Sequence, residues 1–187
     1  MRDVEQIAAV SARDRWLIAR GPKGGEVVAE APDKVAALVD VARALGAAGI
    51  RFALVGGVAV GVHSGVPRAT ADTDLAVVST VDRDLVTRVL TAAGFRFVGQ
   101  FRHSTNFRHP SGEPVQLVFD PEFDVMIDRA EHIDVGDLAV PIVGKDDLIA
   151  MKERAGHDPA RRRSKALRDL ADAELLKGDV PDPDEGW

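Results

Sequence analysis

Residues 54–77 read LVGGVAVGVHSGVPRATADTDLAV, and they contain the most specific pattern of the chain. An apolar segment runs into Gly56-Gly57, and two aspartates, Asp72 and Asp74, follow with one residue between them. In an extended strand every second side chain points to the same face, so these carboxylates lie about 6.5–7 Å apart along the chain. Two carboxylates this close repel each other unless a cation binds between them, and Mg²⁺ is the hard cation that best fits oxygen ligands. Asp72 and Asp74 are therefore predicted to bind metal and to take part in catalysis.

The glycine pair predicts a phosphate site beside the two acids. Glycines that leave a strand and open a helix let backbone N–H groups approach a phosphate, and the helix N-terminus adds partial positive charge. The flanking segments LVGG and LAVV are typical of buried strands, where unpaired carboxylates are costly. We therefore favour a metal site over the alternative that the acids only discourage aggregation at an exposed strand edge.

This order of features resembles the nucleotidyltransferase superfamily of the DNA polymerase β type. That family has a hydrophobic strand, Gly-Gly or Gly-Ser, a short helix, and then Asp-x-Asp on the next strand. Gly65, Arg68 and Thr70, just ahead of Asp72, are most similar to the branch that contains the AbiEii-type and MNT-type toxins of bacterial toxin–antitoxin systems. The resemblance covers roughly residues 35–176. It implies an α+β fold, with a mixed β-sheet flanked by helices and a helical C-terminal part.

The resemblance also implies roles for the residues of the motif. The glycine pair would hold the triphosphate of an NTP, and the aspartate pair would hold Mg²⁺. Arg68 and Thr70 are placed with the nucleotide-binding residues. The alternatives are a structural ion pair for Arg68 and stabilisation of the turn into the strand for Thr70.

A third carboxylate is missing where the family generally has one. By resemblance, the neighbouring strand is residues 115–120, VQLVFD, and Gln116 stands at the position of the expected acid. An amide oxygen can bind a metal, but an amide cannot serve as a base. Asp120 is the nearby candidate for this catalytic role. It lies roughly 13 Å further along a straight strand, so only a bulge or a shifted register would bring it to the site.

The C-terminal segment carries the second part of the resemblance. Lys152 matches a helix lysine of the AbiEii-type pattern, and Asp169 and Asp172 match an acidic pair on the following helix. The two acids share a helix face because they are three residues apart. The resemblance implies that Lys152 contacts the triphosphate and takes part in catalysis. The alternative is that these are solvated surface charges.

Positive charge is concentrated in the same segment. Residues 145–168 contain eight basic and four acidic residues, within a chain of net charge −6. Such a surplus would attract an NTP or an RNA backbone. The alternative for the cluster Arg161-Arg162-Arg163 is a solvated helix face with a basic linker.

The stretch FRHSTNFRH at residues 101–109 places polar side chains near a strand turn. His103, Asn106 and His109 could contact an acceptor substrate there. The five histidines do not alternate with carboxylates in a metal-binding pattern, so we do not expect a zinc site.

Composition sets the outer limits. The chain has 187 residues, of which 45% are hydrophobic and 29% charged, so it is long enough for one domain with a core. It has no cysteine, which excludes disulfides and thiolate metal sites. The N-terminal residues carry charges throughout, and no run reaches about 18 apolar residues, so we expect a cytoplasmic protein without a membrane segment.

Hydrophobic periodicity predicts the remaining elements. We expect helices at 33–48, 82–93, 145–155 and 160–177, and a short one after the glycine pair. We expect strands at 51–55, 72–78, 95–101, 105–108 and 114–119. The predicted organisation is an N-terminal helix and loop extension (1–32), a nucleotidyltransferase core (33–143), a helical C-terminal part (144–178) and a disordered acidic tail (179–187).

The leading hypothesis is an Mg²⁺-dependent nucleotidyltransferase that transfers NMP from an NTP to a hydroxyl acceptor and releases pyrophosphate. The acceptor would be RNA, particularly a tRNA end, a protein hydroxyl, or a small molecule such as an aminoglycoside. The toxin-like resemblance implies a cognate antitoxin as partner. The alternative is a catalytically weak or inactive nucleotide-binding interaction module of the same fold, which Gln116 supports. A phosphohydrolase is the third hypothesis.

Overall fold

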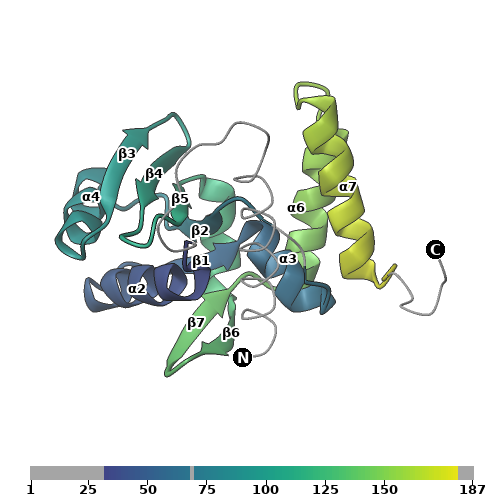
Figure 1. Cartoon of the computed structure of the whole chain (residues 1–187). Coiled ribbons are helices and arrows are strands. Elements are labelled where there is room, and N and C mark those ends of the chain that lie inside the picture. The colour runs from purple at the N-terminus through teal and green to yellow at the C-terminus, as the bar shows by residue number, and fades with distance from the viewer. Residues whose placement is uncertain (1–31, 68–69, 181–187) are drawn as a thin grey trace, which may run out of the picture.

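Seven strands form one mixed β-sheet in the computed structural model, which describes residues 32–67 and 70–180 (Figure 1). In spatial order they are β3 (Arg96–Gln100), β4 (Ser104–Arg108), β5 (Pro114–Val118), β2 (Thr73–Val77), β1 (Phe52–Val55), β7 (Leu138–Ile142) and β6 (Glu131–Val135). The helical segments are α2 (Lys34–Ala47), α3 (Gly56–Ser64), α4 (Arg83–Ala92), the 3-10 turn η1 (Pro121–Phe123), α5 (Asp124–Asp128), α6 (Lys145–His157) and α7 (Arg163–Lys177). The predicted α+β fold with a mixed sheet is confirmed.

The central strands run in both directions. β1 pairs antiparallel with β2 and parallel with β7, and β2 pairs parallel with β5. The antiparallel pairs β3–β4, β4–β5 and β6–β7 extend the sheet on both sides. Because parallel strands end at the same edge of a sheet, α3 after β1 and α6 after β7 begin near each other and are in contact.

The two faces of the sheet differ in burial. Thr73, Val115 and Phe107 lie in one row across β2, β5 and β4, and all three are buried on the face that α2 covers. The next row, on the opposite face, contains Asp74 and Gln116, which are only half-buried. Alternation along each strand therefore places the polar row on the more open face.

Helix α2 begins where the sequence predicts. Asp33 caps it, since its Oδ1 accepts a hydrogen bond from the Ala36 N–H at 2.9 Å. Leu38 and Leu45 are fully buried on the side of the helix that faces the sheet. Burial of a leucine side chain contributes about 1.5–3 kcal/mol, so this apolar stripe attaches α2 to the core.

Helices α6 and α7 form a hairpin at one side of the sheet, with α3 between them and β1 (Figure 1). Gly156 permits their close approach, because a Cβ atom there would lie only 2.5 Å from the Leu170 side chain. Helix α6 includes Gly156 and ends at His157. The sequence-based expectation that it ends at Ala155, and that the next helix begins at Ala160 instead of Arg163, was wrong.

The sequence analysis missed the β6–β7 hairpin and α5. Strand β6 contains Glu131, His132 and Asp134, which are exposed at the sheet edge and give no apolar alternation. Strand β7 contains Pro141, a residue that argues against a strand. Its pairing with β1 is limited to Leu54 and Ile142, so the proline lies outside that ladder.

Several expectations fall outside the described residues. These are the extension predicted for residues 1–32 apart from its last residue, Arg68, and the acidic tail from residue 181 onward. Among residues 32–67 and 70–180, no helix is long and apolar enough to cross a membrane.

Candidate active site

The glycine bend and the second aspartate lie against each other. Gly56 begins α3 directly after β1 and has a φ of +71°, and Val55 pairs with Asp74 across the β1–β2 ladder. A Cβ atom at Gly56 would lie 2.2 Å from Asp74 Oδ2. Both the backbone conformation and the space therefore require glycine here. The Asp74 carboxylate is thus directed at the N-terminal turn of a helix.

Thr70 and Gly57 form the next contact of the bend. A Cβ atom at Gly57 would lie 2.8 Å from Thr70 Oγ1, and that hydroxyl donates to the Asp72 carbonyl at 3.3 Å. The structure thus brings together Gly56, Gly57, Thr70, Asp72 and Asp74. Asp72 itself precedes β2 by one residue, instead of lying within the strand as predicted.

The environment of Asp74 disfavours its charge. Burial raises the pKa of Asp74 from 3.8 to about 7, and repulsion by the Asp72 carboxylate adds to the increase. Positive charges act in the opposite direction, and in decreasing order they are Lys152, Lys34 and Lys165. The site therefore consists of two adjacent carboxylates with three lysines in their field.

Lys34 and Glu113 form a buried ion pair behind the acids. Lys34 is 2% exposed and Glu113 is fully buried, and the Lys34 Nζ also donates to the Asp72 carbonyl at 3.1 Å. Thr73 Oγ1 donates to Glu113 at 3.2 Å. This cluster fixes the backbone on which the two acids are mounted. A buried pair of this kind adds structural specificity more readily than net stability.

Lys152 is held by the two acids that the sequence analysis grouped with it. Its Nζ lies 3.0 Å from Asp169 Oδ1 and 2.9 Å from Asp172 Oδ2, and all three side chains are largely buried. Arg161 pairs with the second oxygen of Asp169. Asp169 and Asp172 therefore fix Lys152 on the side of the site formed by the α6–α7 hairpin.

Gln116 lies beside Asp74, as the resemblance implied. The two residues are partners in the parallel β2–β5 ladder, which has no bulge. The Gln116 Nε2 donates to Ser104 Oγ at 3.2 Å. An uncharged amide therefore stands next to the carboxylate pair.

The structure does not bring Asp120 to the pair. Asp120 lies beyond the opposite end of β5, where it caps η1 by accepting from the Glu122 N–H at 3.2 Å. It also lies 3.6 Å from His103. The bulge or register shift that its predicted catalytic role requires is not present in the β2–β5 ladder, so that expectation is corrected.

Solved structures similar to this chain include an antigenic nucleotidyltransferase-like protein from Paracoccidioides brasiliensis, with a TM-score of 0.55 and 25% identity over 81% of this chain and 78% of that one. The antibiotic-resistance factor ANT(2'')-Ia has a TM-score of 0.56 and 15% identity, over 78% of this chain and 85% of that one. The lincosamide antibiotic adenylyltransferase LnuA, lincomycin-bound, has a TM-score of 0.53 and 16% identity, over 76% of this chain and 96% of that one. No family model and no curated relative matches the sequence.

The chain has the nucleotidyltransferase fold. The comparisons identify this fold and do not distinguish the AbiEii-type or MNT-type branch from others.

Within this nucleotidyltransferase fold, the acidic pair fits a divalent cation. Asp72 and Asp74 offer carboxylate oxygens at a half-buried position, and the repulsion that raises the pKa of Asp74 is relieved by a bound cation. No cluster of three or more potential ligands among His, Cys, Asp and Glu occurs in the described part of the chain. The remaining oxygens of a Mg²⁺ shell would therefore come from substrate phosphate and water.

Two lysines that act on the acidic pair are not predicted from the sequence. Lys34, at the first position of an amphipathic helix, resembles any solvated lysine. Lys165 is one of several basic residues in its segment. No local pattern identifies either residue, since both act on Asp74 electrostatically from segments that are distant in sequence.

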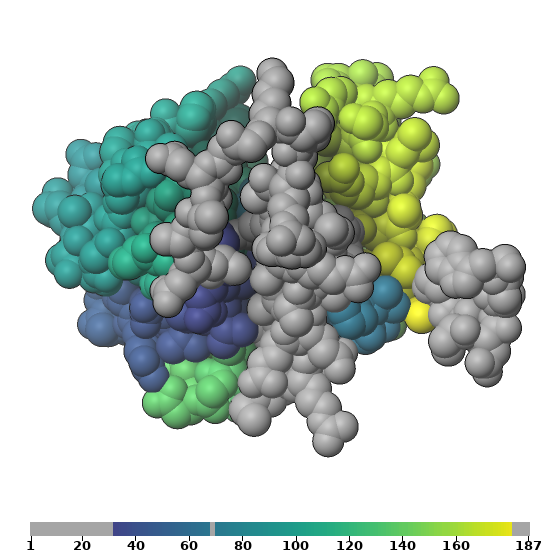
Figure 2. Space-filling model, in the orientation of Figure 1, coloured from purple at the N-terminus to yellow at the C-terminus, as the bar shows by residue number. Residues whose placement is uncertain are grey.

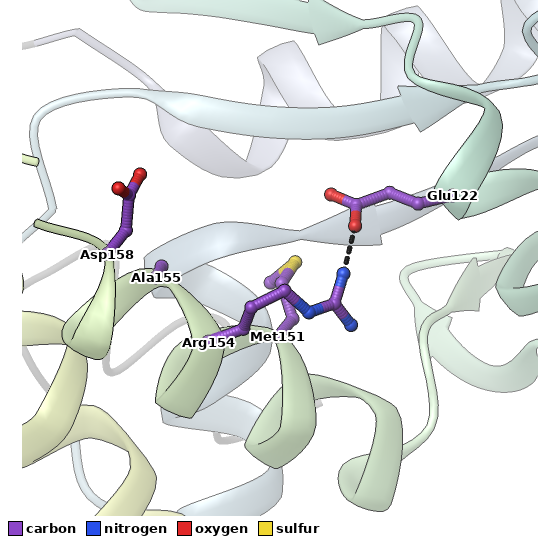
Figure 3. A pocket seen from close by; sticks show the side chains of 5 residues that line it. All are labelled: Glu122, Met151, Arg154, Ala155 and Asp158. Atoms are coloured by element: carbon purple, nitrogen blue, oxygen red, sulfur yellow. Dashed lines mark hydrogen bonds and ion pairs between the residues drawn. The ribbon is translucent and has the colours of Figure 1, made fainter. Parts of the chain in front are cut away.

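A cavity of about 340 Å³ lies between α6 and η1 (Figure 3). Its walls carry charges of both signs, and Arg154 of α6 reaches across to pair with Glu122. The lining residues are Glu122, Met151, Arg154, Ala155 and Asp158. The ion pair attaches α6 to the segment that follows β5.

The other polar residues of the 101–109 stretch have separate positions. His109 is buried and contacts Asp40 at 3.0 Å and Ser111 at 2.8 Å, so it joins the β4–β5 turn to α2. Asn106 lies beside Gln116 on the same face as Asp74.

Proposed function

We propose that the protein is a Mg²⁺-dependent nucleotidyltransferase that transfers an NMP unit from an NTP to a hydroxyl acceptor. The observation that carries this proposal is the contact of Gly56 with Asp74, which places a helix N-terminus beside two carboxylates. One group of atoms can then bind both the phosphates and the cation that accompanies them. The nucleotidyltransferase fold supports the same function.

The residues of the chain have distinct roles in this reaction. Backbone N–H groups at Gly56 and Gly57 would bind the triphosphate. Asp72 and Asp74 would hold Mg²⁺, which when bound neutralises phosphate charge and orients the α-phosphate. Lys152 would offset the negative charge that grows on the departing pyrophosphate. Asp169 and Asp172 would position Lys152 for this task.

The bonds that change follow from in-line transfer. The acceptor oxygen forms a bond to the α-phosphorus, the bond from that phosphorus to the α,β-bridging oxygen breaks, and pyrophosphate leaves. The hydroxyl proton passes to water, because Gln116 can orient the hydroxyl but cannot take its proton.

Small-molecule acceptors receive support from proteins of similar fold. One structure of ANT(2'')-Ia contains adenylyl-2''-tobramycin, and the LnuA structure contains lincomycin. The basic segment at the start of α7 supports RNA as the other acceptor class, since Arg162, Arg163 and Lys165 are exposed. The toxin role and the antitoxin partner remain proposals that depend on the sequence resemblance.

The test is incubation with each α-labelled NTP, Mg²⁺ and a panel of acceptors that contains total tRNA, protein and aminoglycosides. We expect label transfer that is lost in Asp72→Ala and Asp74→Ala. Asp134→Ala, at an exposed position of the edge strand β6, is the matched control and should retain activity. Label transfer that persists in both site variants would contradict the proposal.

Gln116 favours a second candidate function, a module that binds Mg²⁺–NTP without transferring it. The two candidates differ in the response to Gln116→Asp. If the amide limits catalysis, this variant should raise transfer by roughly a hundredfold, the contribution of a positioned base. Asp120→Asn keeps the cap of η1 and should change nothing. NTP binding without transfer in both the wild type and Gln116→Asp would establish the module.

A further inference from the structure

A row of side chains crosses the open face of the sheet, starting from Asp74. Strand register aligns Asp74 with Gln116, Gln116 with Asn106, and Asn106 with Gly99. Neighbouring strands are about 4.8 Å apart, so Asn106 lies about 10 Å from Asp74. Asn106 Oδ1 is shielded from solvent and accepts no hydrogen bond from the described residues. A row of polar side chains, one of which holds a shielded acceptor atom without a hydrogen bond from the described residues, therefore extends from the acids along β5 and β4.

Two arginines stand directly opposite each other next to this row. Arg96 of β3 pairs with Arg108 of β4, and the following pair, Phe97 and Phe107, lies on the opposite face, where Phe107 is buried. Alternation therefore places Arg96 and Arg108 on the face of Asp74. Both are exposed, on the arm of the sheet that forms the teal surface in Figure 2.

The charge of this arginine pair is not neutralised by acids of the described chain. Neither arginine forms an ion pair with a residue in 32–67 or 70–180, and Arg108 donates only to the Gly112 carbonyl, at 2.7 Å. Glu113, nearby in the chain, is directed to the opposite face, where it pairs with Lys34. Like charges directly opposite on a sheet are destabilising, and a bound anion removes that cost.

The position of the pair relates it to the acceptor. The glycine bend lies on the β1 side of Asp74, and the arginines lie on its β5 side, beyond β4. In an in-line transfer the attacking and leaving oxygens are on opposite sides of the phosphorus. Pyrophosphate on the β1 side therefore directs the acceptor to the β5–β4–β3 side.

We propose that β5, β4 and β3 form the acceptor site, and that the acceptor carries a phosphate group near its reactive hydroxyl. This inference rests on the proposed function. Gln116 and Asn106 bind the hydroxyl-bearing sugar, and Arg96 and Arg108 bind the phosphate, for which guanidinium groups have suitable bidentate geometry. Arg108 follows Asn106 by two residues, about 6.6 Å, which matches the span from a sugar hydroxyl to the phosphate of the same nucleotide. An RNA end and a free sugar phosphate share this chemistry.

A binding assay tests the site without requiring turnover. The probe is a short fluorescent RNA with a free 3′ hydroxyl, titrated with the full chain by anisotropy. We expect Arg96→Gln/Arg108→Gln to weaken binding by about tenfold or more and to lower the slope of log K against log salt by about 0.7. Arg88→Gln, an exposed arginine on α4, is the matched control. Affinity for Mg²⁺–NTP should be unchanged in the double variant.

Competition identifies the source of the phosphate. Displacement of the RNA by ribose 5-phosphate but not by ribose would show that the site recognises a phosphate group that both ligands carry. Tight binding of RNA that ribose 5-phosphate does not displace assigns the site to an RNA end, whereas binding of ribose 5-phosphate without RNA assigns it to a small sugar phosphate. Equal RNA affinity in the wild type and the double variant, no binding of either probe, or competition by ribose as strong as by ribose 5-phosphate would overturn the proposal.

Failure here and failure of the proposed function give different results. If the arginines do not bind a phosphate but label transfer still depends on Asp72, the proposed transferase activity is supported and the acceptor binds at another site. If binding depends on the arginines but no NMP is transferred, the phosphate site is supported and the proposed transferase activity is not.

Discussion

At the scale of single residues, the site depends on one close approach. Gly56 and Asp74 are 18 positions apart in the sequence, yet the glycine has space for nothing larger than a hydrogen atom beside the carboxylate. The identity of each residue therefore constrains the other. The same contact directs the carboxylate toward the helix N-terminus, where a cation and a phosphate can share it.

We expect Gly56→Ala to abolish nucleotide transfer and to destabilise the protein by more than about 1 kcal/mol. Its methyl group would collide with Asp74 Oδ2, and the φ of +71° disfavours any side chain. Nucleotide affinity, transfer rate and urea unfolding are the measurements. Gly46→Ala is the control, because that position in α2 has no atom within 4 Å and should be stable or slightly stabilised. Normal transfer in Gly56→Ala would contradict this account.

The protonation of Asp74 should make stability and metal binding depend on pH. Its pKa is raised from 3.8 to about 7 by burial and by Asp72, so the folded state holds one proton more than the unfolded state between these values. The contribution of the protonated Asp74 carboxyl to the free energy of unfolding is fully present below about pH 4. It is lost as the pH rises through about 7. Mg²⁺ requires the ionised form, so its stabilising effect should be larger near pH 8 than near pH 5.

Melting curves with and without Mg²⁺ at these two pH values measure the effect. The difference between the wild type and Asp74→Asn isolates this carboxyl group from other titrating acids, because asparagine has no titratable proton. A Mg²⁺-induced shift that is the same at both pH values would contradict the assignment of Asp74 as a ligand.

At the scale of elements, helix α2 supports from behind the strand that carries Asp74. Lys34, at its first turn, binds both Glu113 and the carbonyl of Asp72. Three segments that are distant in sequence therefore meet at one buried charge. This arrangement explains why a helix outside the motif affects the geometry of the acids.

We expect Lys34→Met to destabilise the fold by about 3–5 kcal/mol, because it removes the cation from a buried ion pair. Lys34→Met/Glu113→Leu should recover much of this loss in folding, since both charges of this ion pair are then removed. Transfer should stay impaired in the double variant, because the Asp72 carbonyl has lost its lysine donor and keeps only the Thr70 hydroxyl. Urea unfolding and transfer kinetics distinguish the two effects. A double variant as unstable as the single one would contradict the explanation.

At the scale of the whole molecule, the site combines the sheet with the α6–α7 hairpin. The sheet supplies the two acids and the glycine bend, while the hairpin supplies Lys152 and Lys165. Helix α3 contacts both parts. A bound Mg²⁺–NTP would therefore touch segments on both sides of α3.

We expect a non-hydrolysable NTP with Mg²⁺ to slow backbone hydrogen exchange in α3 and in the part of α6 around Lys152. Ligands that bind the folded state suppress the local opening of the segments they contact. The change should be small in Asp72→Ala, which lacks one metal ligand. Protection confined to the sheet, with none in α6, would contradict the role of Lys152.

The sequence by itself determined the motif, the helices around it and the position of the unusual amide. Gly56-Gly57 and Asp72-x-Asp74 are local patterns with a specific chemistry, and amphipathic periodicity located α2 and α4 to within about two residues. The register of Asp74 with Gln116 followed from the resemblance and agrees with the ladder.

Which distant side chains act on Asp72 and Asp74 depends on how the chain packs, and this is seen only in the three-dimensional structure. Lys34 and Lys165 carry no local signal, and the position of Asp120 depended on a ladder without a bulge. The β6–β7 hairpin was missed because its edge position leaves polar residues exposed and its proline lies outside the β1 ladder. Short-range patterns reflect contacts along one element, whereas the field at Asp74 is the sum of charges that only chain packing brings together.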